Sequence, residues 1–118
     1  MKTVLAAVLA LPAVLALSSP AAAAEGERLF NLQCKSCHGA KSTPMGPALG
    51  GVFGADIAGR ADFNYSAGLK AKDGTWTAQA LDSYLAKPMA FAPGTRMMVA
   101  VPAATSRAEI IDYLKTLK

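Results

Sequence analysis

One pentapeptide contains both cysteines and the single histidine of this 118-residue chain. It reads Cys34-Lys35-Ser36-Cys37-His38, so two thiols lie three positions apart and an imidazole follows directly. Two thiols at this spacing can each add across one vinyl group of a porphyrin, and the adjacent imidazole can then bind the iron. The motif therefore predicts one covalently attached haem c, with Cys34 and Cys37 as attachment points and His38 as an axial ligand of the metal.

A structural zinc site and a redox-active dithiol are two other functions of cysteine and histidine, and both account for the pentapeptide less well. A structural zinc site needs about four Cys or His ligands, and the pentapeptide already contains every one in the chain. A thiol-disulfide oxidoreductase that uses the Cys-x-x-Cys pair is an alternative, because an exported chain meets oxidants. That alternative predicts a βαβ pattern around the motif and gives His38 no role.

Residues 1–24 have the features of a secretory signal peptide. Lys2 supplies the positive charge, Val4 to Leu17 form the apolar segment, and Ala22 to Ala24 supply the small residues of a cleavage site. Cleavage leaves one domain, residues 25–118, of a size at which a core without a prosthetic group is marginal. We therefore expect export to a bacterial periplasm; an uncleaved leader that acts as a tether is the alternative.

The remaining sequence predicts an all-α fold of about four short helices. The first is expected from Glu25 to Lys35, and a second, short one from Ala67 to Lys72 with Ser66 as its N-cap. The segments between the helices are rich in Gly and Pro, in particular residues 38–59 and 89–102. Loops this long are expected to be ordered by wrapping round a flat cofactor.

Two longer helices are predicted in the second half of the chain. Thr75 can cap a helix whose apolar residues recur at helical spacing from Trp76 to Leu85, until Pro88 ends it. Ser106-Arg107-Ala108-Glu109 has the form of a capping box and precedes an apolar stripe from Ile110 to Leu117.

The second axial ligand decides between electron transfer and the binding of small molecules. Because the chain has a single histidine, a methionine sulfur is the expected donor. Met45 lies too close to the attachment site, which leaves Met89, Met97 and Met98 as candidates. The residues alone do not choose among these three.

The chain resembles the class I c-type cytochromes, the soluble monohaem family that includes mitochondrial cytochrome c. The likeness covers nearly all of the chain after the leader and implies the cytochrome c fold around one haem. The residues that carry it are Gly26, Phe30, Cys34 to His38, Gly46-Pro47-x-Leu49, Phe63-x-Tyr65-Ser66, Trp76, Tyr84-Leu85, Pro88, Pro93-Gly94-Thr95-Arg96-Met97 and Asp112-Tyr113-Leu114-Lys115.

The resemblance implies which residues hold the iron. Met97, which closes the Pro-Gly-Thr-Arg-Met run, is implied as the sixth ligand, and Met98 as a packing neighbour. The carbonyl of Pro47 is implied to accept a hydrogen bond from the second ring nitrogen of His38, which fixes the tautomer and the ring plane.

The resemblance also implies roles for three aromatic residues and for the helix ends. Tyr65 and Trp76 would donate hydrogen bonds to a haem propionate, and Tyr84 would lie near the sulfur of Met97. Gly26 would allow the first helix to cross the last one closely, against the face from Ile110 to Tyr113.

The sequence departs from the family pattern at two places. The family often has a basic residue directly after the Phe-Gly of the central loop, where this chain has Ala55; Arg60 follows five residues later. A docking lysine that follows Pro88 in the mitochondrial protein is replaced by Met89.

Ligation by His38 and Met97 leaves no open position on the iron, so the sequence predicts a monomeric electron carrier and not an enzyme. The expected partners are redox proteins with acidic docking surfaces, because four cations flank the motif, the third helix and the Met97 loop: Lys35, Lys41, Lys87 and Arg96. The net charge of +4 gives no support for nucleic-acid binding, and no stable membrane insertion is expected after leader cleavage. A haem sensor or peroxidase-like protein with a labile Met97 is the alternative.

Overall fold

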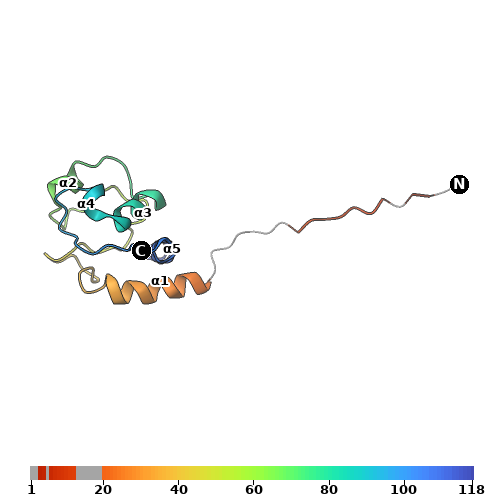
Figure 1. The fold of residues 1–118 in the computed structure, drawn as a ribbon, viewed down its shortest axis with the longest axis horizontal. Helices are drawn as coiled ribbons and strands as arrows, with labels where there is room; N and C mark the ends of the chain where they lie inside the picture. The colour runs from red at the N-terminus through yellow and green to blue at the C-terminus, as the bar shows by residue number, and fades with distance from the viewer. Residues whose placement is uncertain (1–2, 5, 13–19) are drawn as a thin grey trace.

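The computed structural model describes residues 3–4, 6–12 and 20–118, and over these residues it has five helices (Figure 1). They are α1 (Pro20–Gln33), α2 (Ala67–Lys70), α3 (Ala78–Ala86), α4 (Pro88–Phe91) and α5 (Ala104–Leu114). Of these described helices, only α3 and α4 follow each other without a loop of several residues. This part of the chain contains no strand, so the predicted all-α class is confirmed. Lys2 and parts of the apolar segment of the predicted leader lie outside the described residues. None of the helices described is long and apolar enough to span a membrane.

Helix α1 begins at Pro20 and not at Glu25 as predicted. Proline suits the first position of a helix because its missing N–H would have no partner there, and the alanines that follow are the strongest helix formers. The alanine run of the predicted cleavage site is therefore part of α1. The helix ends at Gln33, and the amide of Cys34 still bonds to the carbonyl of Phe30 at 2.8 Å.

The predicted cap of α3 was wrong by two residues. Thr75 pairs with Asp56 in an isolated bridge. The next residue, Trp76, is also bonded to that loop, with its amide donating to Ala55 and its carbonyl accepting from Gly54, so no helix starts directly after Thr75. Thr77 takes this role, and its hydroxyl accepts a hydrogen bond from the amide of Ala80 at 3.1 Å. Ser66 caps α2 as expected, with its hydroxyl accepting from the amide of Leu69.

The second half differs from prediction at two further points. Pro88 follows the end of α3 but also occupies the first turn of α4, so residues 89–91 are helical and not irregular. The predicted capping box is absent, because α5 starts before Ser106, at Ala104. Arg107 accounts for this earlier start: its guanidinium donates to the carbonyls of Val101 and Pro102 and to Asp82 of α3, which ties the incoming chain to the helix.

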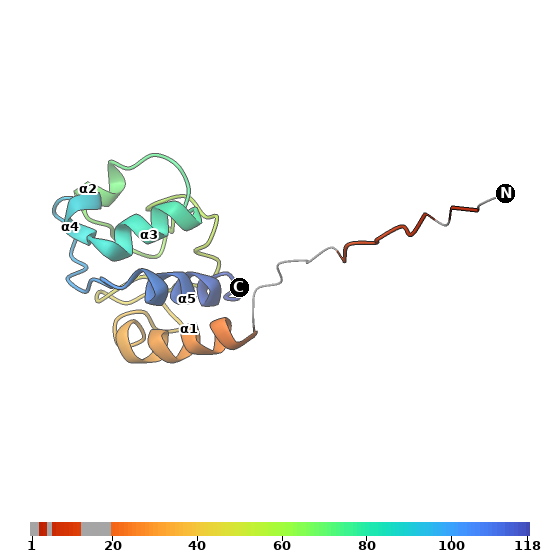
Figure 2. The same ribbon diagram turned by 45° about the vertical axis from the view of Figure 1, so that its right-hand side comes forward.

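The core lies where α5 packs between α1 and α3 (Figure 2). Ile110 of α5 is 1% exposed, and Leu114 and Leu29 are buried beside it in the same cluster. The rings of Phe30 and Tyr113 pack 5.2 Å apart across the contact between α1 and α5. The first and last helices therefore form one layer, and the pentapeptide follows directly from the end of α1.

Candidate haem-binding site

The pentapeptide forms a tight turn at the end of α1. The amides of Cys37 and His38 both bond to the carbonyl of Cys34, at 3.1 and 2.9 Å. Cys34 is buried in the apolar core, whereas Cys37 is half-buried, and both thiols are free. The turn thus presents two thiols and an imidazole from one short stretch of backbone.

The environment of Cys34 is unlike that of a reactive dithiol. Burial, together with the neighbouring Cys37, raises the pKa of the Cys34 thiol to about 11. The cysteines of thiol-disulfide oxidoreductases instead have lowered pKa values, because the thiolate is the attacking species. Nor do the described residues contain the strands that this alternative requires. The geometry therefore disfavours the oxidoreductase alternative.

The ring of His38 is held by the loop that follows it. Its Nδ1 lies 2.8 Å from the carbonyl oxygen of Pro47, which is the contact expected for this pair. A carbonyl can only accept, so Nδ1 carries a proton, and in the neutral ring the free lone pair is then on Nε2. Gly46 allows the close approach, because a Cβ there would lie 3.2 Å from the ring and 2.6 Å from the carbonyl oxygen of Cys37.

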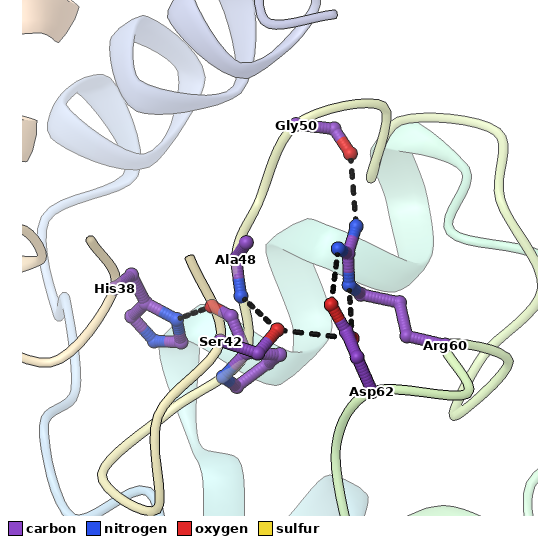
Figure 3. A network of polar contacts seen from close by, with 7 residues as sticks. His38, Ser42, Ala48, Gly50, Arg60 and Asp62 are labelled. Atoms are coloured by element: carbon purple, nitrogen blue, oxygen red, sulfur yellow. Dashed lines mark hydrogen bonds and ion pairs between the residues drawn. The ribbon is translucent and has the colours of Figure 1, made fainter. Parts of the chain in front are cut away.

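A polar network fixes the same loop from its other side (Figure 3). The hydroxyl of Ser42 accepts from the amide of Ala48 at 2.9 Å and lies 3.0 Å from Asp62. Both oxygens of Asp62 bind the guanidinium of Arg60 at 2.9 Å, and Arg60 also donates to the carbonyl of Gly50 at 3.3 Å. The guanidinium of Arg60 is thus bound by Asp62 and Gly50. If Arg60 takes the place of the basic residue that the family has at the position of Ala55, it does so from within this network.

Burial distinguishes the candidate methionines. Met97 is half-buried and packs against the apolar cluster that contains Cys34. Met98 is 80% exposed, Met45 72% and Met89 51%. A ligand to a buried metal needs its sulfur in the interior, so Met97 fits best among these four residues.

The loop that contains Met97 is held through Thr95. The hydroxyl of this buried residue lies 2.6 Å from that of Tyr84 and also accepts from the amide of Met97 at 3.3 Å. Tyr84 therefore reaches the Met97 loop through Thr95. Burial raises the pKa of the Tyr84 hydroxyl, so it stays protonated over the physiological range. Thr95 was missed as a site residue, although it lies within the Pro-Gly-Thr-Arg-Met run.

The aromatic residues form two groups. Trp76 is buried and packs against Phe91 and Tyr84, with ring centroids 5.7 and 5.3 Å apart. Tyr65 is half-buried, packs edge-on to Phe63 at 5.0 Å, and burial raises its pKa. Within the described part of the chain, no other residue hydrogen-bonds to the indole N–H of Trp76, and solvent still reaches it. This donor is therefore available to a bound anionic group such as a propionate.

The side chains of this site match those that attach and ligate a c-type haem. Cys34 belongs to one apolar cluster and Met97 packs against it, while Cys37 and His38 follow Cys34 in the same tight turn. Two thiols, a histidine and a thioether are the donor set of a c-type haem. Sequence reasoning missed Ser42, Asp62 and Phe91, because polar loop residues and one aromatic residue have no local signal that links them to the motif.

Comparison with known proteins gives consistent matches. A family model described as cytochrome c matches residues 23–118. The chain is 45% identical over 94 residues to the cytochrome c-type cyt cy of Rhodobacter capsulatus, a match that covers 78% of this chain and 47% of that protein. It is 40% identical over 96 residues to cytochrome c2 of Rhodomicrobium vannielii, which covers 78% of this chain and 76% of that protein. The chain spans about half the length of two curated relatives, from Rhodobacter capsulatus and Bradyrhizobium diazoefficiens.

A solved structure is also similar. Cytochrome cH from Methylobacterium extorquens matches with a TM-score of 0.74 and 39% identity, over 80% of this chain and 97% of that one.

Proposed function

Because this chain belongs to the cytochrome c family, whose members have one covalently bound haem c, we propose that it carries single electrons between redox proteins of the periplasm. The observation that supports this most directly is the His38 ring, whose Nδ1 donates to Pro47 and whose Nε2 is free to bind iron. When bound, the haem supplies the redox chemistry by exchanging one electron between the ferric and ferrous states of its iron.

The residues of the chain divide the task of holding this group. Cys34 and Cys37 would each form one thioether, and His38 and Met97 would take the two axial positions. The indole N–H of Trp76 would donate to a propionate, and we propose the same role for the hydroxyl of Tyr65. The bond from Thr95 to Tyr84 restrains the Met97 loop, so the sulfur would stay in place as the iron changes charge.

Binding of the iron by both His38 and Met97 would leave no site on it for a substrate, which supports a carrier and not an enzyme. The second candidate is a haem sensor or peroxidase-like protein in which Met97 dissociates. That candidate needs a loop that opens easily, whereas Thr95 in this loop is 4% exposed and bonded to Tyr84.

One preparation tests the proposed function. Protein expressed with periplasmic haem attachment should show a low-spin visible spectrum that changes on reduction, and a haem stain should survive a denaturing gel. A high-spin spectrum that binds ligands at neutral pH would favour the sensor or peroxidase-like candidate. Absence of any Soret band would contradict haem binding. The mass of the same sample locates the N-terminus, which we propose to be Glu25 after leader cleavage.

Replacement of Met97 tests the ligand assignment. Met97→Ala should abolish the weak sulfur-to-iron absorption band of the oxidised protein and lower the reduction potential, because a thioether favours the ferrous state. Met98→Ala is the matched control, since its side chain is exposed, and should retain the band. Loss of the band in Met98→Ala alone would identify Met98 as the ligand. Survival of the band in both variants would point to Met89.

Charge reversal tests the proposed docking surface. Lys35 and Lys87 are both exposed and make no side-chain hydrogen bond with other described residues, so Lys35→Glu and Lys87→Glu should leave the fold unchanged. Both should slow electron transfer to an acidic partner roughly tenfold at low ionic strength and flatten its salt dependence. Arg96 is less suitable, because it donates to the carbonyl of Asn64 beside the Met97 loop.

The control for this experiment is Lys115→Glu at the end of α5, which makes the same change in net charge; because it also breaks the surface pair with Asp112, its thermal stability is measured alongside. Equal slowing by all three variants would show a general charge effect and no defined surface. Unchanged rates in the Lys35 and Lys87 variants would show that docking is mainly apolar.

A further inference from the structure

We propose that Ser42 and Asp62 are positioning residues for His38: they act through the peptide group between Pro47 and Ala48 and set how strongly the imidazole donates to iron. This inference rests on the proposed haem ligation by His38. It assigns a function to a network of polar loop residues that the ligand set itself does not use (Figure 3).

Pro47 and Ala48 share one planar peptide group. The carbonyl of Pro47 accepts from Nδ1 of His38 at 2.8 Å, and the amide of Ala48 donates to Ser42 at 2.9 Å. This carbonyl and this amide belong to the same peptide bond, which is trans and planar, so they point in opposite directions. His38 and Ser42 therefore form hydrogen bonds to opposite edges of one rigid peptide group. A shift of this peptide group at Ser42 also moves the acceptor of the imidazole N–H.

The hydroxyl of Ser42 is itself oriented. It has one proton, and because its oxygen accepts from Ala48, that proton is free to be donated to Asp62 Oδ1 at 3.0 Å. The guanidinium of Arg60 binds both oxygens of Asp62 and holds the pKa of that carboxyl below its ordinary value, to which the bond from Ser42 adds. The carboxylate is therefore charged at neutral pH and remains an acceptor for Ser42.

The same network holds the far end of the segment. Arg60 donates to the carbonyl of Gly50, three residues beyond Pro47. Gly50 in turn lies against the C-terminus, since a Cβ there would come within 2.6 Å of the carbonyl oxygen of Lys118. Residues 47–50 are thus tied at both ends, and His38 bonds to a fixed acceptor.

The order of donors and acceptors in the network predicts the direction in which it shifts the reduction potential. A carboxylate that accepts from Ser42 makes the hydroxyl oxygen a better acceptor, which polarises the peptide group and strengthens the bond from His38 to Pro47. A histidine whose second nitrogen donates strongly is a stronger ligand through the first. Stronger donation favours ferric iron, so the network should lower the reduction potential.

Ser42→Ala in the haem-loaded protein tests the link. The reduction potential should rise, and the Nδ1 proton of His38, followed by NMR in the reduced protein, should exchange with solvent roughly fivefold faster, the factor expected for the loss of one hydrogen bond. Ser42→Thr retains the hydroxyl and should restore both values. Ser83→Ala makes the same chemical change on the exposed face of α3 and should alter neither.

Asp62→Asn tests the carboxylate, and a double variant separates the bonded route from a through-space charge effect. If Asp62 acts through Ser42, its replacement should change the potential much less in the Ser42→Ala background than in the native one. A charge effect would be equal in both backgrounds. Asp112→Asn, which removes another carboxylate that is paired with a lysine, is the control for net charge.

Failure of the inference is distinguishable from failure of the proposed function. A protein with no haem after denaturation would contradict haem ligation itself. A normal low-spin spectrum, with potential and proton exchange unchanged in Ser42→Ala, would overturn the inference alone. Equal effects of Asp62→Asn in the two backgrounds would overturn the route through Ser42.

Discussion

Replacement of both Cys34 and Cys37 with Ala is expected to abolish the haem that survives denaturation and to reduce accumulation of the protein severely. The thiols supply the only two attachment points in the chain, so no covalent bond can form in their absence. Loss of attachment also removes a group that fills the interior of a domain of marginal size, so the folded state should lose much of its stability. Haem staining of a denaturing gel and the yield of exported protein measure the two effects.

Ser36→Ala is the matched control, because it changes one of the two residues between the cysteines and leaves both thiols in place. It should retain the stain and the yield. A double variant that kept a denaturation-resistant haem would show that attachment does not use these thiols.

Gly26→Ala should destabilise the protein by about 2 kcal/mol or more. Gly26 is buried where α1 crosses α5, and a Cβ there would lie 2.0 Å from the carbonyl oxygen of Glu109 and 3.0 Å from Cβ of Tyr113. Alanine gains ~1 kcal/mol in helix propensity. A clash with backbone cannot be relieved by a side-chain rotation, and overpacking costs about 1–3 kcal/mol or more. At 2.0 Å the Cβ would lie far inside van der Waals contact, so the cost should reach or exceed the upper end of this range, ~3 kcal/mol, and outweigh the propensity gain by about 2 kcal/mol.

Unfolding in guanidinium chloride measures this effect. Gly39→Ala is the control, because its nearest neighbour would be the carbonyl oxygen of Lys41 at 4.0 Å, and we expect its stability to stay near that of the native protein. If Gly26→Ala were equally stable, α1 and α5 would have to cross at a different point.

The local signals of the sequence predicted the existence of most helices, but non-local contacts decided where they start. Ser66 caps α2 as expected, because the hydroxyl and the Leu69 amide that it accepts from lie only three residues apart in the sequence. Thr75 and Thr77 flank Trp76 and are equivalent as local caps, and only the bridge to Asp56 determines that Thr77 caps α3. The capping-box pattern at Ser106 was likewise overridden, because Arg107 binds Asp82 of a different helix.

The same distinction applies to the site. The contact between His38 and Pro47 was expected from a resemblance that includes both residues. Ser42 and Asp62 are separated by twenty positions, in loops without periodicity, so no local pattern predicts that they meet. The partnership of Tyr84 with Thr95 also joins a helix to an irregular loop and required the three-dimensional fold.

The packing of α1 on α5 imposes an order of events on biosynthesis. An isolated helix the length of α1 is marginal in water, so α1 needs its tertiary partner to persist. That partner is α5, whose residues leave the ribosome or cross a membrane later than those of α1 and of the pentapeptide. Until they arrive, the layer that buries Cys34 is incomplete and its thiol remains open to modification. The attachment motif should therefore stay accessible from its own synthesis until α5 docks on α1, and only that docking should enclose it.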